Sequence, residues 1–205
     1  MSSSSFPIDA QTVLVADASV AINLNATGCA LEIIRAQPGA VVITENALAE
    51  LAEGRRNGHR DYDQIQALIA ANAMQVFRLD ESGNKVYASL VDGTAIRTLD
   101  DGEAATIGFA CQTGAIALID ERKAQSICAA DFPALRVVST VDFLTHSLVA
   151  DALGESALAQ AIVNALRNAR MRVPPHQMEM IVKLIGEEAA LNCTSLPKAH
   201  RAAAV

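Results

Sequence analysis

Two short apolar runs in the sequence each end on an aspartate. VLVAD ends at Asp17, and AIALID ends at Asp120. Runs this short and this rich in Val, Ile, Leu and Ala are typical of strands buried on both faces, as in parallel sheets. An ionised carboxylate at the end of such a strand destabilises the fold unless another group pairs with it. In a wound α/β sheet the carboxyl ends of the strands line the ligand crevice, so the two aspartates indicate a cation site there.

Strands and helices alternate along the first two thirds of the chain. Strands are predicted over residues 13–17, 40–43, 74–79, 115–119 and 135–138. Helices are predicted over residues 18–25, 29–36, 45–53, 60–73, 84–92, 100–112 and 121–129. Gly54 is expected to end the third helix, and Glu81-Ser-Gly83 is expected to break the strand over 74–79 before the fifth helix begins. This alternation implies right-handed crossovers and a parallel sheet, which places the chain in the α/β class.

The last third of the chain is predicted to be helical. Helices are expected near residues 140–152, 155–169 and 174–190, with Pro174-Pro175 placed at a helix start. The predicted organisation is a flexible lead over residues 1–11, an α/β domain over 12–150, a helical extension packed on it over 151–190, and a tail over 191–205.

Composition narrows the class of protein. The chain has 205 residues, 51% of them hydrophobic and none of them Trp, which fits an α/β domain better than a β-sandwich. The formal net charge of −7 argues against non-specific binding of nucleic acid through a basic face. It leaves open an enzyme that holds a phosphate backbone through metal ions and a few local cations. The N-terminus lacks the features of a signal peptide and no apolar run reaches membrane-spanning length, so we expect a cytoplasmic protein that makes no membrane contact.

Cysteine and histidine do not form a metal-binding pattern. The four cysteines contain no C-x-x-C pair and lie in or beside apolar stretches, which predicts buried free thiols in a reducing compartment. The four histidines are scattered and form no H-E-x-x-H motif. These spacings argue against a zinc site.

Asp17, Ser19 and Glu50 each have a structural explanation beside the functional one. Asp17 would cap the helix that follows it, although its place after a buried strand favours a functional role. Ser19 would either cap the same helix or hydrogen-bond a metal-bound water. Glu50, in ITENALAELAEG, lies at the boundary of the apolar stripe of its helix, where a solvated position is equally reasonable. Glu45 and Glu53 compete with it for any role.

Glu103 and Asp120 begin successive helices. Asp100 and Glu103, in LDDGEAATIGFA, have the spacing of a capping box, which is a structural explanation for both. Three acids within four residues exceed what capping requires, however, and their helix leads into the strand that ends at Asp120. Asp120 and Glu121 lie where a helix dipole stabilises acids. The position of Asp120 at the end of a second apolar strand still favours function, with Glu121 less certain.

The four carboxylates Asp17, Glu50, Glu103 and Asp120 are predicted at corresponding ends of strands or on facing helices of one sheet. Ligand sets made only of oxygen select Mg²⁺ or Mn²⁺ over zinc. A cluster of three or four carboxylates around one or two such ions is suited to phosphodiester hydrolysis, because the ions activate water and stabilise the developing negative charge.

Four segments of the sequence resemble PIN-domain ribonucleases. They are DASVAINL after the first strand, ITENALAELAEG, LDDGEAATIGFA and ALIDERKA, and they occur in the order and approximate spacing of that family. LDDGEA and LIDERKA are especially similar to a bacterial PIN-like subgroup described as uncharacterised nucleic-acid-binding proteins. The resemblance covers roughly residues 12–188, because the helices after residue 140 are also similar to the C-terminal part of that subgroup.

The resemblance implies a Rossmann-like three-layer α/β/α fold with a central parallel sheet and extra C-terminal helices. It also implies an acidic Mg²⁺ or Mn²⁺ pocket, cleavage of single-stranded RNA, and a place as the toxin of a toxin–antitoxin pair that forms a homodimer. Carried over residue by residue, the metal-binding and catalytic carboxylates are Asp17, Glu50, Glu103 and Asp120, with Ser19 and Glu121 as auxiliary candidates. Glu103 departs from the Asp of many toxins. The candidate phosphate contacts are Arg55, Arg56, Arg97, Arg122 and Lys123.

Three other functions are alternatives to a nuclease. A PIN-like module that binds RNA or a protein partner without efficient cleavage is the main alternative. A haloacid-dehalogenase-type phosphatase also places an aspartate after its first strand, but it requires a second Asp where this chain has Ser19. A dinucleotide-binding Rossmann domain fits less well, since no G-x-G-x-x-G follows the first strand.

Overall fold

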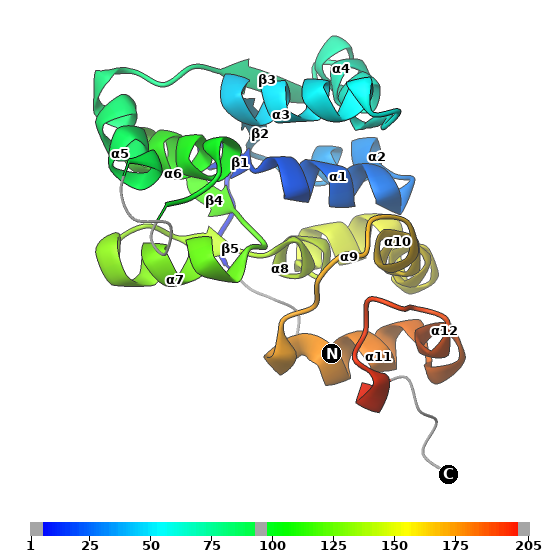
Figure 1. Cartoon of the computed structure of the whole chain (residues 1–205). Coiled ribbons are helices and arrows are strands. Elements are labelled where there is room, and N and C mark those ends of the chain that lie inside the picture. Colours follow the sequence, from blue (N-terminus) through cyan, green and yellow to red (C-terminus); the bar gives the residue numbers. More distant parts are fainter. Residues whose placement is uncertain (1–5, 93–97, 201–205) are drawn as a thin grey trace. The chain divides into compact units, whose positions relative to one another are not determined.

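A five-stranded, all-parallel sheet forms the centre of the α/β fold (Figure 1). The computed structural model describes residues 6–92 and 98–200. The strands are β1 (Val13–Ala16), β2 (Ala40–Thr44), β3 (Met74–Phe77), β4 (Ile116–Leu118) and β5 (Val137–Val138). The predicted α/β class and parallel sheet are confirmed.

The strand order β3-β2-β1-β4-β5 places β1 in the middle. Ala16 at the end of β1 pairs with Ile43 of β2 on one side and with Leu118 of β4 on the other. The chain winds outward from β1 to β3 and then returns to the other side of β1 to form β4. Such a reversal opens a crevice at the carboxyl ends of the central strands, which is the usual ligand position in this architecture.

Helices connect the strands and continue to the C-terminus. The first seven are α1 (Ala18–Thr27), α2 (Ala30–Arg35), α3 (Glu45–Arg56), α4 (Asp61–Ala70), α5 (Glu81–Val91), α6 (Asp101–Thr113) and α7 (Arg122–Asp131). The later ones are α8 (Thr140–Leu144), α9 (Ser147–Leu153), α10 (Glu155–Asn168), η1 (Pro175–Gln177), α11 (Met178–Ile185), α12 (Glu187–Leu191) and η2 (Lys198–His200).

The chain divides into two compact units. The sheet unit consists of Ile8–Ala21 and Gln37–Ser139 and contains all five strands. The helical unit takes in residues 22–36 and the chain from Thr140 onward, together with Phe6 and Pro7. Helix α1 contributes residues to both units. The candidate carboxylates all belong to the sheet unit.

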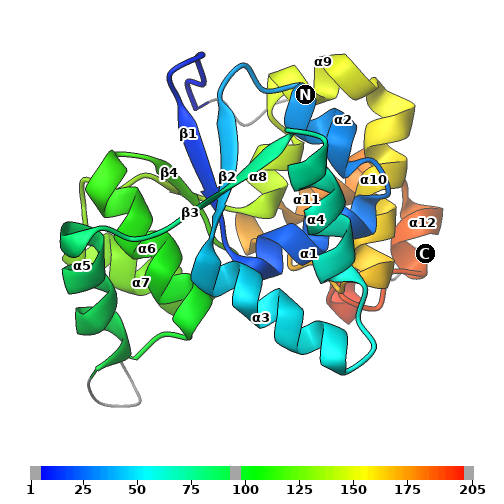
Figure 2. The same cartoon turned by 90° about the horizontal axis from the view of Figure 1, so that it is seen from above.

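Helices α5, α6 and α7 lie on one side of the strands in the sheet unit, and α4 lies on the other (Figure 2). The core on the first side is built from Val15, Val42 and Ile119 of the strand region, together with Ile107 and Phe109 of α6. Most of the α6 sequence is buried, which explains why a helix so rich in Ala and Gly shows no polar face along most of its length.

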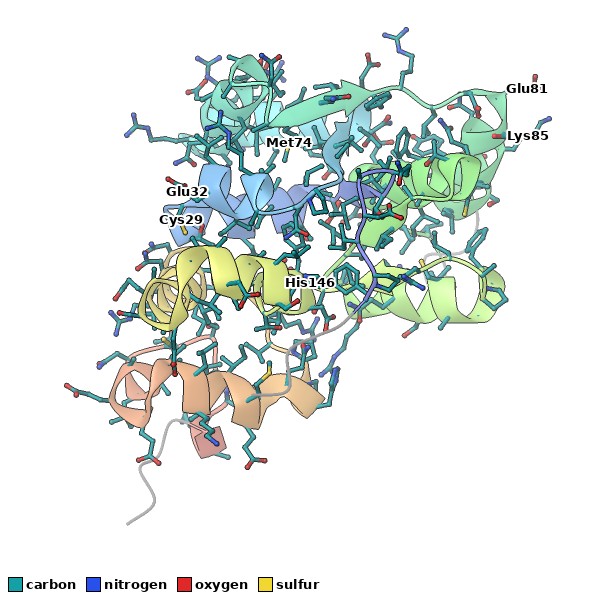
Figure 3. All side chains as sticks on the ribbon, turned by 180° about the vertical axis from the view of Figure 1, so that it is seen from behind. Cys29, Glu32, Met74, Glu81, Lys85 and His146 are labelled. Atoms are coloured by element: carbon teal, nitrogen blue, oxygen red, sulfur yellow. The ribbon has the colours of Figure 1, made fainter. Side chains whose placement is uncertain are left out.

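A close glycine contact joins α5 and α6. A Cβ added to Gly108 would lie 2.7 Å from the carbonyl oxygen of Gly83, and one added to Gly83 would lie 3.2 Å from the carbonyl oxygen of Gly108. The two backbones can approach this closely only because neither position has a side chain. Outside this contact, Lys85 Nζ lies 2.8 Å from Glu81 Oε1 in an exposed ion pair on α5 (Figure 3).

Two glycine-based predictions are wrong. Glu81-Ser-Gly83 is the first turn of α5 rather than an interruption, because Asp80 caps the helix and its Oδ1 accepts a hydrogen bond of 2.9 Å from the Gly83 amide. Gly54 does not end α3, which continues to Arg56. Gly83, predicted as a break after a strand, and Gly54, predicted as a helix end, both lie inside helices.

His146 holds the start of α9 in the helical unit. Its Nδ1 accepts a hydrogen bond of 3.3 Å from the Leu148 amide, and its Nε2 lies 2.8 Å from the Phe6 carbonyl oxygen. Because Nδ1 accepts, Nε2 carries the hydrogen and donates a hydrogen bond to the Phe6 carbonyl oxygen. The Phe6 side chain is buried against the imidazole ring, inside the lead predicted over residues 1–11.

The cysteines are free, but only Cys128 and Cys193 are buried. Cys29 is half-buried and Cys111 is exposed, so the prediction of four buried thiols is wrong for these two.

Within residues 6–92 and 98–200, no helix has both the length and the apolar character needed to cross a membrane.

Candidate functional site

Asp17 lies at the carboxyl end of β1, between the central strand and α1. Its amide donates to the Leu118 carbonyl across the sheet at 3.2 Å. Its Oδ2 accepts hydrogen bonds from the Ser19 amide at 3.2 Å and from Ser19 Oγ at 2.7 Å, so the capping role of Asp17 is real. The side chain is 2% exposed, and Oδ1 has no hydrogen-bond partner within the described part of the chain.

The orphaned Oδ1 atom cannot be explained by capping. Burial raises the pKa of the Asp17 carboxyl, the hydrogen bonds from Ser19 oppose that shift, and the nearby charge of Asp100 adds to it. A buried carboxylate with an unpaired oxygen is costly to the fold. Asp17 therefore has the features of a group that is held ready for a cation.

Glu50 projects from α3 toward the start of α6. Its Oε1 accepts a hydrogen bond of 2.7 Å from the Gly102 amide. Burial raises the pKa of the Glu50 carboxyl; the Gly102 amide opposes this, and the charges of Asp17 and Asp100 add to it. The competitor Glu45 instead forms an exposed ion pair with Arg78, with the closer of two contacts at 2.8 Å.

Glu103 occupies the first turn of α6. Burial and the neighbouring charge of Asp17 raise the pKa of its carboxyl to about 7. A hydrogen bond from the Asp100 amide lowers the pKa, whereas the charges of Asp100 and Glu121 raise it. A capping box has two reciprocal hydrogen bonds, and the one from the Asp100 amide to the Glu103 carboxylate is present. The other half is missing, because the Asp100 side chain makes no capping hydrogen bond.

Asp120 and Glu121 follow β4, the strand beside β1. Asp120 is half-buried, as expected for a side chain at the end of a buried strand. Glu121 is exposed and caps α7, its Oε1 accepting from the Lys123 amide at 3.2 Å. Because β1 and β4 are paired through Ala16 and Leu118, the backbone brings the carboxyl ends that precede Asp17 and Asp120 side by side.

The predicted phosphate contacts have different surroundings. Arg55 lies 3.1 Å from Asp63 and stacks over the Tyr62 ring, with 5.7 Å between its Cζ atom and the ring centroid. Arg56 is exposed at the end of the same helix, roughly 9 Å along the axis from Glu50 at about 1.5 Å per residue.

Two further candidates lie at the start of α7. Arg122 is exposed, and Lys123 Nζ donates to the Thr98 carbonyl oxygen, so the ammonium group connects α7 to the segment before α6. Arg97 lies outside the described residues.

Two groups near the acids were missed in the sequence. Asp100 raises the pKa of Asp17, Glu50 and Glu103, so it belongs to the same negative region. The signal for it was the excess of acids over what capping requires. The Gly102 amide was not foreseen, because its partner lies on another helix.

The carboxylate oxygens of the site suit a hard divalent ion, although the described side chains do not converge into a complete ligand set. Carboxylate oxygens are the ligands that Mg²⁺ and Mn²⁺ prefer, and one buried oxygen of Asp17 is unpartnered. Over residues 6–92 and 98–200, no three His, Cys, Asp or Glu side chains are arranged so that they could hold a metal ion. The acids are close enough to raise one another's pKa, and an ion would have to draw them closer.

The raised pKa values predict that the sheet unit becomes less stable as the pH rises. The pKa of Glu103 changes from 4.5 in the unfolded chain to about 7 in the folded protein, so the folded state binds the proton more tightly. The free energy of unfolding should therefore fall between these two pH values and level off above about pH 7. Glu103→Gln should reduce the fall.

Urea unfolding over this pH range measures the effect. Tyrosine fluorescence is the appropriate signal, since both tyrosines, Tyr62 and Tyr87, belong to the sheet unit. An equal pH dependence in the wild-type protein and Glu103→Gln would contradict the prediction.

Comparison with known proteins gave one match. A family model described as PIN domain matches residues 13–187, which include every candidate carboxylate and most of the later helices. Neither the curated proteins nor the solved structures contain a match. The family resemblance inferred from four sequence segments is confirmed by this match.

Proposed function

The chain belongs to the PIN-domain family, and from this membership and its acidic site we propose that it is a metal-dependent endoribonuclease acting on single-stranded RNA. PIN domains are generally nucleases, so the fold is of a nuclease type. A fold alone does not establish an activity, however, because one fold carries many activities and the residues of the site decide between them.

The buried, unpartnered Oδ1 of Asp17 is the observation that carries the proposal. Asp17 lies at the middle of the sheet, where its negative charge raises the pKa of Glu50 and Glu103. A buried carboxylate needs a compensating partner, but the ion pairs Arg55–Asp63, Arg78–Glu45 and Lys85–Glu81 of the described chain leave these three acids out. A divalent cation would relieve both the desolvation and the repulsion.

Asp17, Glu50, Glu103 and Asp120 are the residues that we propose to hold Mg²⁺ or Mn²⁺. When bound, the ion supplies Lewis-acid stabilisation of the scissile phosphate and lowers the pKa of water. Ser19 holds the Asp17 carboxylate in place, and the Gly102 amide holds that of Glu50. Ser19 thus orients Asp17, and Glu121 adds negative charge beside Glu103.

Glu103 would exchange a proton for the ion. Its pKa of about 7 leaves the carboxyl partly protonated at neutral pH. Since a metal ligand must be deprotonated, binding of the ion should release protons. The same repulsion that makes the acids costly to the fold therefore favours uptake of the cation.

RNA would be held mainly by local cations, because the chain as a whole is negative. Arg55, Arg56, Arg122 and Lys123 are the candidates within the described chain. Arg55 and Lys123 already contact Asp63 and Thr98, respectively, so Arg56 and Arg122 are the more readily available phosphate contacts. A small number of such contacts predicts weak salt dependence of binding.

A PIN-like module that binds RNA without cleaving it is the alternative. It is favoured by the absence, in residues 6–92 and 98–200, of a ready-made group of three metal ligands. Glu103, in place of the Asp found in many PIN-type toxins, points in the same direction. An antitoxin partner, a toxin role and a homodimer are further proposals, supported by the family resemblance alone.

The proposal predicts that the purified protein cuts single-stranded RNA when Mn²⁺ or Mg²⁺ is present and stops when EDTA is added. Fluorescently labelled single-stranded RNA, the same RNA in a duplex and single-stranded DNA of matched sequence should be compared. Proton release on Mn²⁺ binding at about pH 7 provides a second measurement. Binding of RNA without cleavage under all metal conditions would favour the alternative.

A further inference from the structure

The first turn of α6 is held by two side chains of α3. Asn46 Nδ2 donates to Asp101 Oδ2 at 2.9 Å, and the Gly102 amide donates to Glu50 Oε1 at 2.7 Å. Asn46 and Glu50 are four residues apart, so they lie on the same face of α3. We call these four residues, Asn46, Glu50, Asp101 and Gly102, the α3–α6 latch.

Helix α5 is connected to the latch through the Asp101 carboxylate. The Tyr87 hydroxyl donates to Asp101 Oδ1, while Asp101 Oδ2 accepts from Asn46. Both oxygens of Asp101 are therefore used to connect α3, α5 and α6. This explains why Asp101 belongs to the scaffold, although it lies between the acids Asp100 and Glu103.

Glu50 caps α6 from another helix. The amides in the first turn of a helix have no partner within the helix and are usually capped by the residue at the N-cap. Asp100 occupies that position, but its side chain makes no capping hydrogen bond. The Gly102 amide instead donates to Glu50, so the cap is supplied by a residue 52 positions earlier in the chain.

The cap requires that residue 102 has no side chain. A Cβ at this position would lie 2.6 Å from Glu50 Oε2, 2.8 Å from Glu50 Cδ and 3.0 Å from Oε1. Contacts this short are not tolerated, so an alanine would displace the carboxylate of Glu50. Gly102 is thus needed for room as well as for its hydrogen bond.

We propose that Gly102 is a positioning residue, which fixes the Glu50 carboxylate against the first turn of α6, the turn that carries Glu103, through its amide and through the absence of a side chain. Glu103 follows Gly102 directly in the chain. The latch therefore ties the position of Glu50 to the turn that carries Glu103. The consequence for metal binding rests on the proposed function. The contact between Gly102 and Glu50 does not.

Gly102→Ala tests the positioning role by its effect on Mn²⁺ affinity. Residues that hold a metal ligand in place typically contribute about 10- to 100-fold to affinity, and we expect a loss in this range. Isothermal titration with Mn²⁺ alone measures it without RNA. Gly54→Ala is the matched control, since it makes the same change on α3, where the added Cβ would find its nearest atom at 3.8 Å. It should leave the affinity unchanged.

A double-mutant cycle separates positioning from general damage to the fold. Glu50→Asp shortens the side chain and moves the carboxylate away from residue 102, so Gly102→Ala should cost much less affinity when Glu50→Asp is already present. Additive losses would show that the two residues do not act on one another and would overturn the proposal. Equal Mn²⁺ affinity of the wild-type protein and Gly102→Ala would overturn it as well.

The amide resonance of Gly102 reports on the contact when no metal is present. A hydrogen bond to a carboxylate should move this proton downfield, and Glu50→Gln should move it back, whereas Gly54→Ala should not. An unchanged resonance in Glu50→Gln would overturn the proposal. If the wild-type protein binds no Mn²⁺ and cuts no RNA but shows this response, the proposed function fails and the contact made by Gly102 stands.

Discussion

Asp17→Asn is expected to lower the rate of RNA cleavage by about 100- to 1,000-fold, since loss of metal-assisted charge stabilisation costs several kcal/mol and about 1.4 kcal/mol corresponds to tenfold. The amide keeps the shape of the side chain and can still accept the hydrogen bonds from Ser19. It removes the negative charge that would hold the ion. Cleavage of labelled single-stranded RNA in Mn²⁺ measures the effect.

The same substitution should not destabilise the sheet unit at neutral pH. Burial raises the pKa of Asp17, so the ionised side chain is unfavourable in the folded state. Asparagine removes that unfavourable charge, and urea unfolding followed by tyrosine fluorescence should show a free energy of unfolding equal to or above that of the wild-type protein. Lost activity in a fully folded variant would separate catalysis from folding.

Asp151→Asn is the matched control for Asp17→Asn. Asp151 is exposed on α9 in the helical unit, and the substitution removes the same charge. It should leave the cleavage rate unchanged. Should Asp17→Asn retain the wild-type rate after careful purification, the nuclease assignment at these residues would be wrong.

Gly108→Ala is expected to destabilise the sheet unit by about 1–3 kcal/mol, the usual cost of overpacking a closely fitted interior. The added Cβ would lie 2.7 Å from the Gly83 carbonyl oxygen, and a backbone atom cannot move aside as a side-chain tip can. Helices α5 and α6 would have to separate. Urea unfolding with tyrosine fluorescence measures the loss, because Tyr87 lies on α5 itself.

Gly54→Ala provides the comparison for this prediction. Alanine is favoured over glycine in a helix interior by about 1 kcal/mol, and residue 54 has space for the Cβ. Gly54→Ala should therefore raise the stability of the unit that Gly108→Ala lowers. Equal stability of Gly108→Ala and the wild-type protein would show that the α5–α6 contact is looser than the structure indicates.

The strands could be predicted from the sequence because their signal is local. The run VLVA is apolar, short and followed by a polar residue, and β1 covers these four residues. The prediction extended one residue further, to Asp17, whose amide still bonds to Leu118 although its side chain caps α1. Local patterns of this kind locate an element well and its last residue less well.

Glycine positions could not be predicted, because their reason is tertiary. The segment Glu81-Ser-Gly83 resembles a turn in its composition. Glycine is required at residue 83, however, because the backbone of Gly108 lies so close to it. Gly54 resembles a helix stop, and yet α3 continues past it. A glycine that permits a close approach and one that ends a helix are the same residue in the sequence.

The site was predictable to the extent that it follows strand ends. Asp17 and Asp120 could be identified from the apolar runs that precede them. Glu50 could not be distinguished from Glu45 or Glu53 by its helical pattern. The structure distinguishes Glu50 by its contact with Gly102, which depends on residues far apart in the chain.

The central position of β1 has a consequence during synthesis. Its neighbours β2 and β4 are made at very different times, because β4 begins about a hundred residues after β1. A growing chain on the ribosome that has not reached Ile116 contains Asp17 and Glu50 but lacks Asp120 and the strand that delivers it. The proposed RNA-cutting centre, assembled in this order, would stay inert beside the messenger that encodes it until most of the polypeptide had emerged.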